Sequence, residues 1–105
     1  MVNGQVGSQV ALRRIEGWAQ KANVIPHKII RAFLQLTDGN VNVSASLENI
    51  RARCQDVRNF RCNFGKMMRD RMETFGRVFV LDEDRVSLVP EVKGRIRQHM
   101  AEFLR

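Results

Sequence analysis

The sequence contains no apolar run that approaches the roughly 20 residues a membrane-spanning helix requires. Residues 1–9 have neither the basic start nor the apolar stretch of a signal peptide. We therefore expect an intracellular protein, in the cytoplasm with the nucleus as the alternative, and no membrane partner. We expect residues 1–9 to be a flexible N-terminal tail and residues 10–105 to form a single domain.

Cysteine and histidine are scarce, which excludes several classes of site. Cys54 and Cys62 are too few for a disulfide framework, and we expect both thiols to be buried. His27 and His99 stand far apart, and no Cys/His group has zinc spacing. The acidic run at 82–84 is expected to be a solvated turn, because adjacent side chains in a tight hairpin diverge. We expect no metal and no cofactor.

Catalytic signatures are also missing. The chain has no phosphate-binding P-loop, no glycine-rich dinucleotide turn and no local Ser/His/Asp signature. We therefore expect a protein that is not an enzyme.

Basic residues, in contrast, are abundant. The net charge is +7, from 18 basic and 11 acidic residues, and 14 of the 18 are arginine. Arginine binds phosphate bidentately and stacks on bases, whereas lysine acts as a point charge. This balance favours nucleic acid as a partner, although a basic solvated surface has the same composition.

Apolar residues recur at helical spacing near the start of the domain. They predict a helix over residues 10–22, which Ser8 can cap. A second helix should begin near Pro26 and end at 38–40, Asp-Gly-Asn. The short alternating stretch at 41–43 then predicts a small strand.

The middle and the end of the chain carry three further helical patterns. One apolar stripe has intervals of three, four and three residues: Leu47, Ile50, Cys54 and Val57. After a break at 58–59, a longer helix should run to Phe75, rich in methionine and closed by Gly76. A closing helix after Pro90 has its own apolar stripe: Val92, Ile96, Met100 and Phe103.

Between the last two helices, residues 77–89 predict a β-hairpin that turns over 83–84, Glu-Asp. In this register Leu81 faces Val86 and Phe79 faces Leu88. These four side chains should point inward, because one face of the hairpin must pack on the helices. The expected core cluster is Phe64, Met68, Phe75, Phe79, Leu81, Val86 and Leu88.

The order of these elements predicts the fold class. Without the first and last helices, the order is helix, strand, helix, helix, strand, strand, as in a winged helix-turn-helix domain. We therefore expect an α+β winged-helix domain with a small antiparallel sheet, an added N-terminal helix and a C-terminal helix. An unrelated α+β domain with the same order is the alternative.

Residues 64–90 resemble the end of a LOTUS domain, also called OST-HTH. The shared pattern is an aromatic-Gly opening, a helix, a small turn, an aliphatic-Phe strand, an acidic turn and Val-x-Leu. The resemblance implies an RNA-regulatory module. Some members bind RNA, some form homodimers, and an extended subset with an added C-terminal helix contacts DEAD-box RNA helicases.

The charge pattern locates the expected binding surface. On the longer helix, Lys66 can pair with Asp70 and Arg69 with Glu73, which leaves its outer face nearly neutral. The acidic hairpin tip would repel a phosphate backbone, so ordinary reading of duplex DNA is disfavoured. The basic residues expected to contact nucleic acid are Arg51, Arg53, Arg58 and Arg61, with Lys66 and Arg69 at the rim.

These observations predict a non-catalytic module that binds nucleic acid, with RNA favoured over duplex DNA. One alternative is a protein-interaction module that docks a partner, such as an RNA helicase, on the methionine-rich helix or the closing helix. A DNA-binding transcriptional regulator is the third candidate.

Overall fold

The computed structural model describes residues 7–105, which form an α+β fold with six helices and a three-stranded antiparallel sheet. The elements in chain order are α1 (Gln9–Ala19), α2 (Ile25–Leu36), β1 (Ala45–Ser46), α3 (Leu47–Ala52), α4 (Phe60–Lys66), β2 (Phe79–Asp82), β3 (Arg85–Leu88), α5 (Pro90–Gln98) and α6 (Met100–Leu104). The strand order is β1-β3-β2. None of the helices in this part of the chain could cross a membrane.

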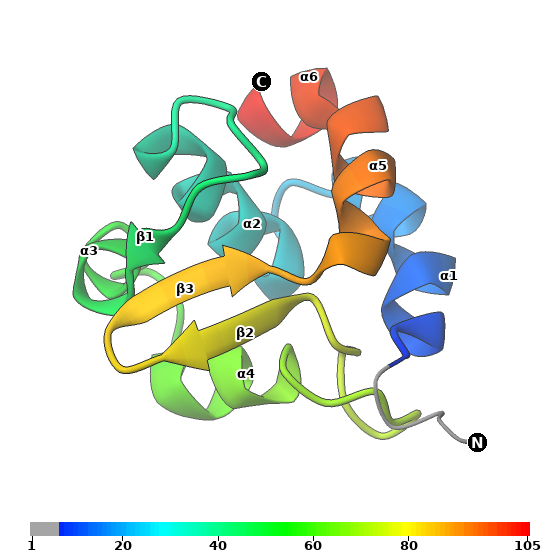
Figure 1. The fold of residues 1–105 in the computed structure, drawn as a ribbon, viewed down its shortest axis with the longest axis horizontal. Helices are drawn as coiled ribbons and strands as arrows, with labels where there is room; N and C mark the ends of the chain where they lie inside the picture. Colours follow the sequence, from blue (N-terminus) through cyan, green and yellow to red (C-terminus); the bar gives the residue numbers. More distant parts are fainter. Residues whose placement is uncertain (1–6) are drawn as a thin grey trace.

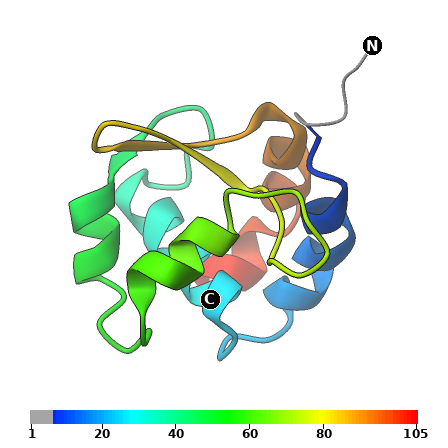
Figure 2. The same ribbon diagram turned by 90° about the horizontal axis from the view of Figure 1, so that it is seen from below.

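The helices lie mainly on one side of the sheet (Figures 1 and 2). α3 is beside β1 at one end of the molecule, and α1 and α5 pack together at the other. α6 closes the fold against α2. Most of the expected tail lies outside the described residues, and Gln9 already belongs to α1.

The first two helices agree with the sequence pattern. Pro26 is in the first turn of α2, and Gly39 follows the helix with a φ of +78°. The expected cap of α1 is wrong: the Ser8 hydroxyl is buried and accepts no hydrogen bond from the first turn. Its backbone carbonyl accepts from the Leu12 amide instead, at 2.9 Å.

The first strand lies four residues later than expected. Residues 41–43 form a turn, in which the Asn42 amide donates to the Asn40 side chain. The strand is Ala45–Ser46, which pairs with β3. Ser46 also caps α3, since its hydroxyl accepts from the Asn49 amide. Pairing and capping together therefore fix the strand, rather than the local alternation of valines.

Helix α3 is shorter than its apolar stripe. It ends at Ala52, yet Cys54 and Val57 are still buried, on the turns that follow. Asn59 adopts a left-handed conformation, with a φ of +52°, and redirects the chain into α4. The expected break at this point is confirmed, but the continuous helix before it is wrong.

The long methionine-rich helix is also wrong, because α4 ends at Lys66. The Lys66 carbonyl accepts from the amides of Phe75 and Gly76, and the Met67 carbonyl accepts from Val78 and Phe79. Residues 67–78 are therefore a folded-back loop, which we call the 67–78 loop. These long-range hydrogen bonds replace those that would have continued the helix.

The loop also changes the expected ion pairs. Asp70 accepts from the Val10 amide at 2.9 Å, so it ties the loop to α1. Glu73 pairs with Arg71 at 3.4 Å. Neither acid takes the i,i+4 partner that a helix would have given it.

The hairpin register is confirmed. Phe79 pairs with Leu88 and Leu81 with Val86, and the turn spans 83–84. The assignment of faces needs a correction: Leu81 is 37% exposed, whereas Val78 and Val89 are fully buried. The base of the hairpin is enclosed on both faces, while residues 80–85 are exposed and Val86, on the central strand β3, is buried.

Four phenylalanines connect three elements through the core. Ring centroids are 5.7 Å apart for Phe60 and Phe64, 5.4 Å for Phe64 and Phe79, and 5.5 Å for Phe79 and Phe33. Within the expected cluster, Phe64, Phe79, Val86 and Leu88 are buried. Met68 and Phe75 are only partly buried, and Leu81 is exposed, so the cluster is smaller than predicted.

The closing helix divides at His99 into α5 and α6. Val92, Ile96 and Phe103 are fully buried, as the stripe predicts, and Met100 is partly buried. The bend lets α5 pack on α1 while α6 packs on α2.

Candidate nucleic-acid interface

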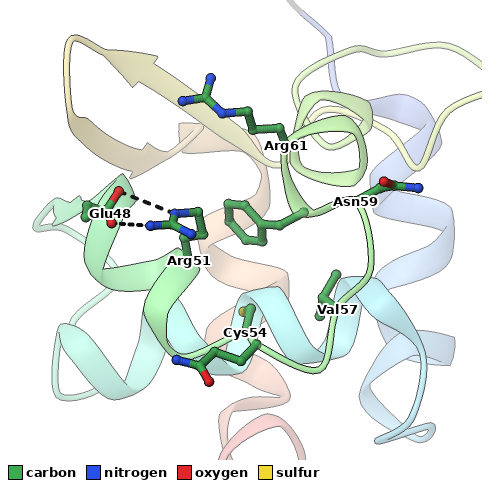
Figure 3. Close-up of a pocket in the computed structure, with 8 residues that line it drawn as sticks. Glu48, Arg51, Cys54, Val57, Asn59 and Arg61 are labelled. Atoms are coloured by element: carbon green, nitrogen blue, oxygen red, sulfur yellow. Dashed lines mark hydrogen bonds and ion pairs between the residues drawn. The ribbon is translucent and has the colours of Figure 1, made fainter.

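A hollow of about 630 Å³ lies between α3 and α4 (Figure 3). Two of the six expected binding residues line it, and a third, Arg58, directly precedes the lining residue Asn59 in the chain. Arg51 borders it from α3, and Arg61 borders it from α4. Its apolar lining comes from Cys54, Val57 and Phe60. The left-handed turn before α4 brings the two helices to either side of this hollow.

Arg51 is partly neutralised by its own helix. It donates two hydrogen bonds to the Glu48 carboxylate, one turn earlier. The hydrogen bond from Arg51, assisted by its charge, lowers the pKa of Glu48, and Arg61 contributes in the same direction. Glu48 is the one acid among the lining residues, against two arginines, so the hollow keeps a net positive charge.

Arg61 and Arg58 are exposed, and within residues 7–105 neither forms an ion pair. Arg58 stands directly before the turn into α4, and its backbone carbonyl accepts from the Asn63 amide group at 2.8 Å. Arg61 therefore brings an unpaired guanidinium to the border of the hollow, and Arg58 carries a second one two residues before the start of α4.

Arg53 belongs to a different surface. It donates to the Gln35 side chain at 3.1 Å, and it lines a smaller hollow against α2 together with Lys28 and Arg31. Lys28 pairs with Asp56 at 2.8 Å, and this hydrogen bond lowers the pKa of Asp56. Lys28 and Arg31 were not among the residues expected to contact nucleic acid, and both are half-buried on this basic surface.

Lys66 is the last residue of α4, and Arg69 follows it on the 67–78 loop. The Lys66 ammonium is 5.8 Å from the ring centroid of Phe75, a cation–π distance. Arg69 is exposed on the 67–78 loop. The six expected residues therefore form three separate groups rather than one continuous strip.

Helix α4 offers little for reading base edges. Its seven residues span about 10 Å at 1.5 Å per residue. Phe60 and Phe64 are buried, and the Asn63 amide group donates to the carbonyls of Arg58 and Asn59. Arg61 is thus the long polar side chain of this helix that is exposed and has hydrogen-bond donors available for a ligand.

The hairpin tip is acidic and exposed, as expected. Asp84 accepts a hydrogen bond from the Ser46 hydroxyl at 2.6 Å, and its carbonyl accepts from the Leu47 amide. Within residues 7–105, no group of three or more His, Cys, Asp or Glu side chains could hold a metal ion.

No family model, curated protein or solved structure matches this chain. The resemblance to LOTUS domains stays an expectation that rests on residues 64–90.

The two cysteines differ in environment. Cys54 is buried in the lining of the hollow, whereas Cys62 on α4 is exposed, so the expectation of two buried thiols is wrong for Cys62. Burial, and next the negative charge of Asp56, raise the pKa of Cys54 to about 11 from 9.0. A thiol reagent at neutral pH should therefore modify Cys62 alone until the protein unfolds.

The raised pKa of Cys54 predicts a loss of stability at alkaline pH. Between about pH 9 and 11 the thiol ionises in the unfolded chain but stays protonated in the folded one, so unfolding is favoured as pH rises. Between pH 8 and pH 10 the free energy of unfolding of the parent should fall by about 1 kcal/mol more than that of Cys54→Ala, as measured by urea unfolding. Cys62→Ala is the matched control and should behave as the parent. Equal losses in all three proteins would contradict the prediction.

Proposed function

We propose that this protein is a non-catalytic nucleic-acid-binding module, which binds RNA in preference to duplex DNA and acts in RNA regulation. The observation that carries the proposal is the positively charged hollow between α3 and α4. Arg61 lines it without an ion-pair partner among the described residues, beside the Arg51–Glu48 pair, and the unpaired Arg58 directly precedes the lining residue Asn59. Such unpaired arginines are the groups that bind phosphate best.

The winged helix-turn-helix fold is part of the same proposal. The element order and the β1-β3-β2 sheet support it, with the β2–β3 hairpin as the wing and α4 as the recognition helix. In this arrangement, phosphate contacts would come from the α3–α4 side rather than from the wing, because the wing tip carries Asp82, Glu83 and Asp84.

Two features favour unpaired RNA over a DNA duplex. Recognition in the major groove needs several side chains that reach base edges, and α4 presents little beyond Arg61. Sequence-tolerant binding of single strands needs instead a basic groove and planar groups on which bases stack. The hollow has the volume of a small-ligand pocket and two guanidinium planes at its border, so one unstacked base could occupy it.

The test compares single-stranded RNA, duplex RNA and duplex DNA by fluorescence anisotropy over a range of salt concentrations. Arg58→Gln/Arg61→Gln should weaken binding of single-stranded RNA and lower the slope of log K against log salt by about 0.7 for each lost phosphate contact. The effect should be similar across base sequences, because phosphate contacts position the ligand without specifying its sequence. Arg51→Gln should have a smaller effect, since Glu48 already offsets that charge.

A matched control removes the same charge elsewhere. Arg13→Gln/Arg97→Gln changes two exposed arginines on α1 and α5, at the opposite end of the molecule from α3 (Figure 1). It should leave the slope nearly unchanged. If the two double variants behave alike, or if the parent binds none of the three ligands at low salt, the proposed interface is only a solvated surface. Tightest binding to duplex DNA would favour a transcriptional regulator instead.

A further inference from the structure

A second hollow, of about 600 Å³, lies at the opposite end of α4 from the first. Its lining comes from the end of α1, the connection into α2 and the 67–78 loop. Figure 2 shows these segments side by side. Its principal lining residues are Arg14, Trp18, Lys21, Ile25, Pro26 and Phe75. The sequence carries a signal for it, because Arg14, Trp18 and Lys21 stand at helical intervals of four and three residues.

The aromatic part of this hollow is fixed by the surrounding structure. Trp18 and Phe75 are both partly exposed, and their rings meet edge to face with centroids 6.4 Å apart. The Trp18 carbonyl accepts from His27 Nδ1 at 2.9 Å, and the Phe75 amide donates to the Lys66 carbonyl at 3.1 Å. The hollow is therefore preformed, which lowers the entropy cost of filling it.

The charged residues that line the hollow have one sign, and Glu73, nearby on the 67–78 loop, pairs with Arg71. Arg14 is held by the carbonyls of Thr74 and Met72, which position its guanidinium without cancelling its charge. Lys66 lies over the ring of Phe75, and Lys21 is exposed. The lining residues include no acid. Glu16, the acid of α1, projects about 200° around the helix from Arg14.

We propose that this hollow is a docking site for an acidic amphipathic segment of a partner protein. An apolar anchor of the segment would pack against Trp18, Phe75 and the aliphatic residues at the start of α2. Flanking Glu or Asp side chains would lie near Arg14, Lys21 and Lys66. Charge complementarity selects the acidic segment, because a basic or neutral one would leave three cations without a counter-charge.

The apolar lining favours a peptide over a nucleic-acid base. Ile25 and Pro26 provide aliphatic surface, and Phe75 meets Trp18 at 88°, so the two rings do not form parallel planes between which a base could insert. The surface is separate from the hollow between α3 and α4, and the two proposals can fail independently.

The test uses Trp18 as its own reporter, because the chain has one tryptophan and no tyrosine. The probe is a synthetic helical peptide with Leu and Phe at i, i+3, i+4 and i+7 and Glu or Asp at its other positions. Titration should shift the Trp18 emission to shorter wavelength in a saturable way. Lys21→Glu should weaken binding about fivefold to tenfold, whereas Arg13→Glu, the matched change on another face of α1, should alter it less than about twofold.

Two altered peptides and a single-stranded RNA are titrated in the same way. Replacing the Leu and Phe residues by Ser, or the acidic residues by Lys, should abolish the shift. Equal binding of the Lys-containing peptide, no saturable shift with the acidic peptide, or no effect of Lys21→Glu in a protein with parental circular dichroism would overturn the proposal. If single-stranded RNA produces the shift and Lys21→Glu removes it, the hollow binds a base and the peptide assignment is wrong.

Discussion

Replacing Phe79 by alanine should lower the free energy of unfolding by about 3–5 kcal/mol. Phe79 is fully buried and lies between the rings of Phe33 and Phe64, so it joins β2 to α2 and α4. Alanine would remove both ring contacts and leave a cavity in a close-packed core. Because small domains are stable by about 5–15 kcal/mol, the loss should appear clearly in urea unfolding.

Leu81→Ala is the matched control, on the same strand and the same face of the pleat. Leu81 is 37% exposed, so this change should cost about 1 kcal/mol or less. If both variants lose a similar amount of unfolding free energy, the hairpin does not pack as the structure has it. If Phe79→Ala unfolds at the same urea concentration as the parent, the Phe79 ring is exposed.

Gly76→Ala should destabilise the protein by about 2–6 kcal/mol, through two separate causes. Gly76 has a φ of +113°, a conformation that alanine adopts only with strain. A Cβ atom there would lie 2.5 Å from the Ala11 backbone nitrogen and 2.8 Å from its Cα. Backbone atoms cannot rotate away as a flexible side chain can, so the 67–78 loop would have to separate from α1.

The control for this variant is Gly94→Ala in α5. A Cβ at Gly94 meets no atom within 4 Å, and alanine is the better helix former by up to about 1 kcal/mol. Gly94→Ala should therefore unfold at an equal or higher urea concentration than the parent. Gly76→Ala should also lose the edge-to-face contact of Phe75 with Trp18, and tryptophan fluorescence would report this loss. Unchanged stability of Gly76→Ala would contradict the close approach of the loop to α1.

The two hairpin strands illustrate what a local pattern predicts well. Their register follows from side-chain alternation and from a two-residue turn, so Phe79–Leu88 and Leu81–Val86 could be paired before the fold was seen. The exposure of Leu81 could not be predicted, because alternation assigns a face and does not say which strand lies at the edge of the sheet. Leu81 is on the edge strand β2, whereas Val86, opposite it on the central strand β3, is fully buried.

The ends of α3 and α4 show where the local pattern fails. An apolar stripe through Leu47, Ile50, Cys54 and Val57 fits a helix, but the same residues are buried just as well from the turns after Ala52. Helical spacing beyond Lys66 is likewise overridden, since the carbonyls of Lys66 and Met67 bond to amides of residues 75–79. Short helices depend on tertiary packing more than on their own propensity.

The same helix ends decide the candidate site. The sequence supplied the arginines and predicted their exposure, because charged residues between apolar stripes lie on the outside. It placed Arg53 with Arg51 and Arg61, whereas the early end of α3 directs Arg53 toward Gln35 and Arg31. It also could not predict that Glu48 would offset Arg51 or that Arg58 and Arg61 would stay unpaired.

The sequence by itself determined the order of helices and strands, the register of the hairpin and the basic charge of the surface. These properties depend on residue types and on spacings of a few positions. The tertiary structure alone decided which cations share a hollow, and it alone brought Phe75 against Trp18. The second of these results comes from contacts between residues more than 50 positions apart, such as Gly76 on Ala11 and Arg14 on the carbonyl of Thr74. No local periodicity encodes such contacts, because they form only when the packed core brings distant segments together.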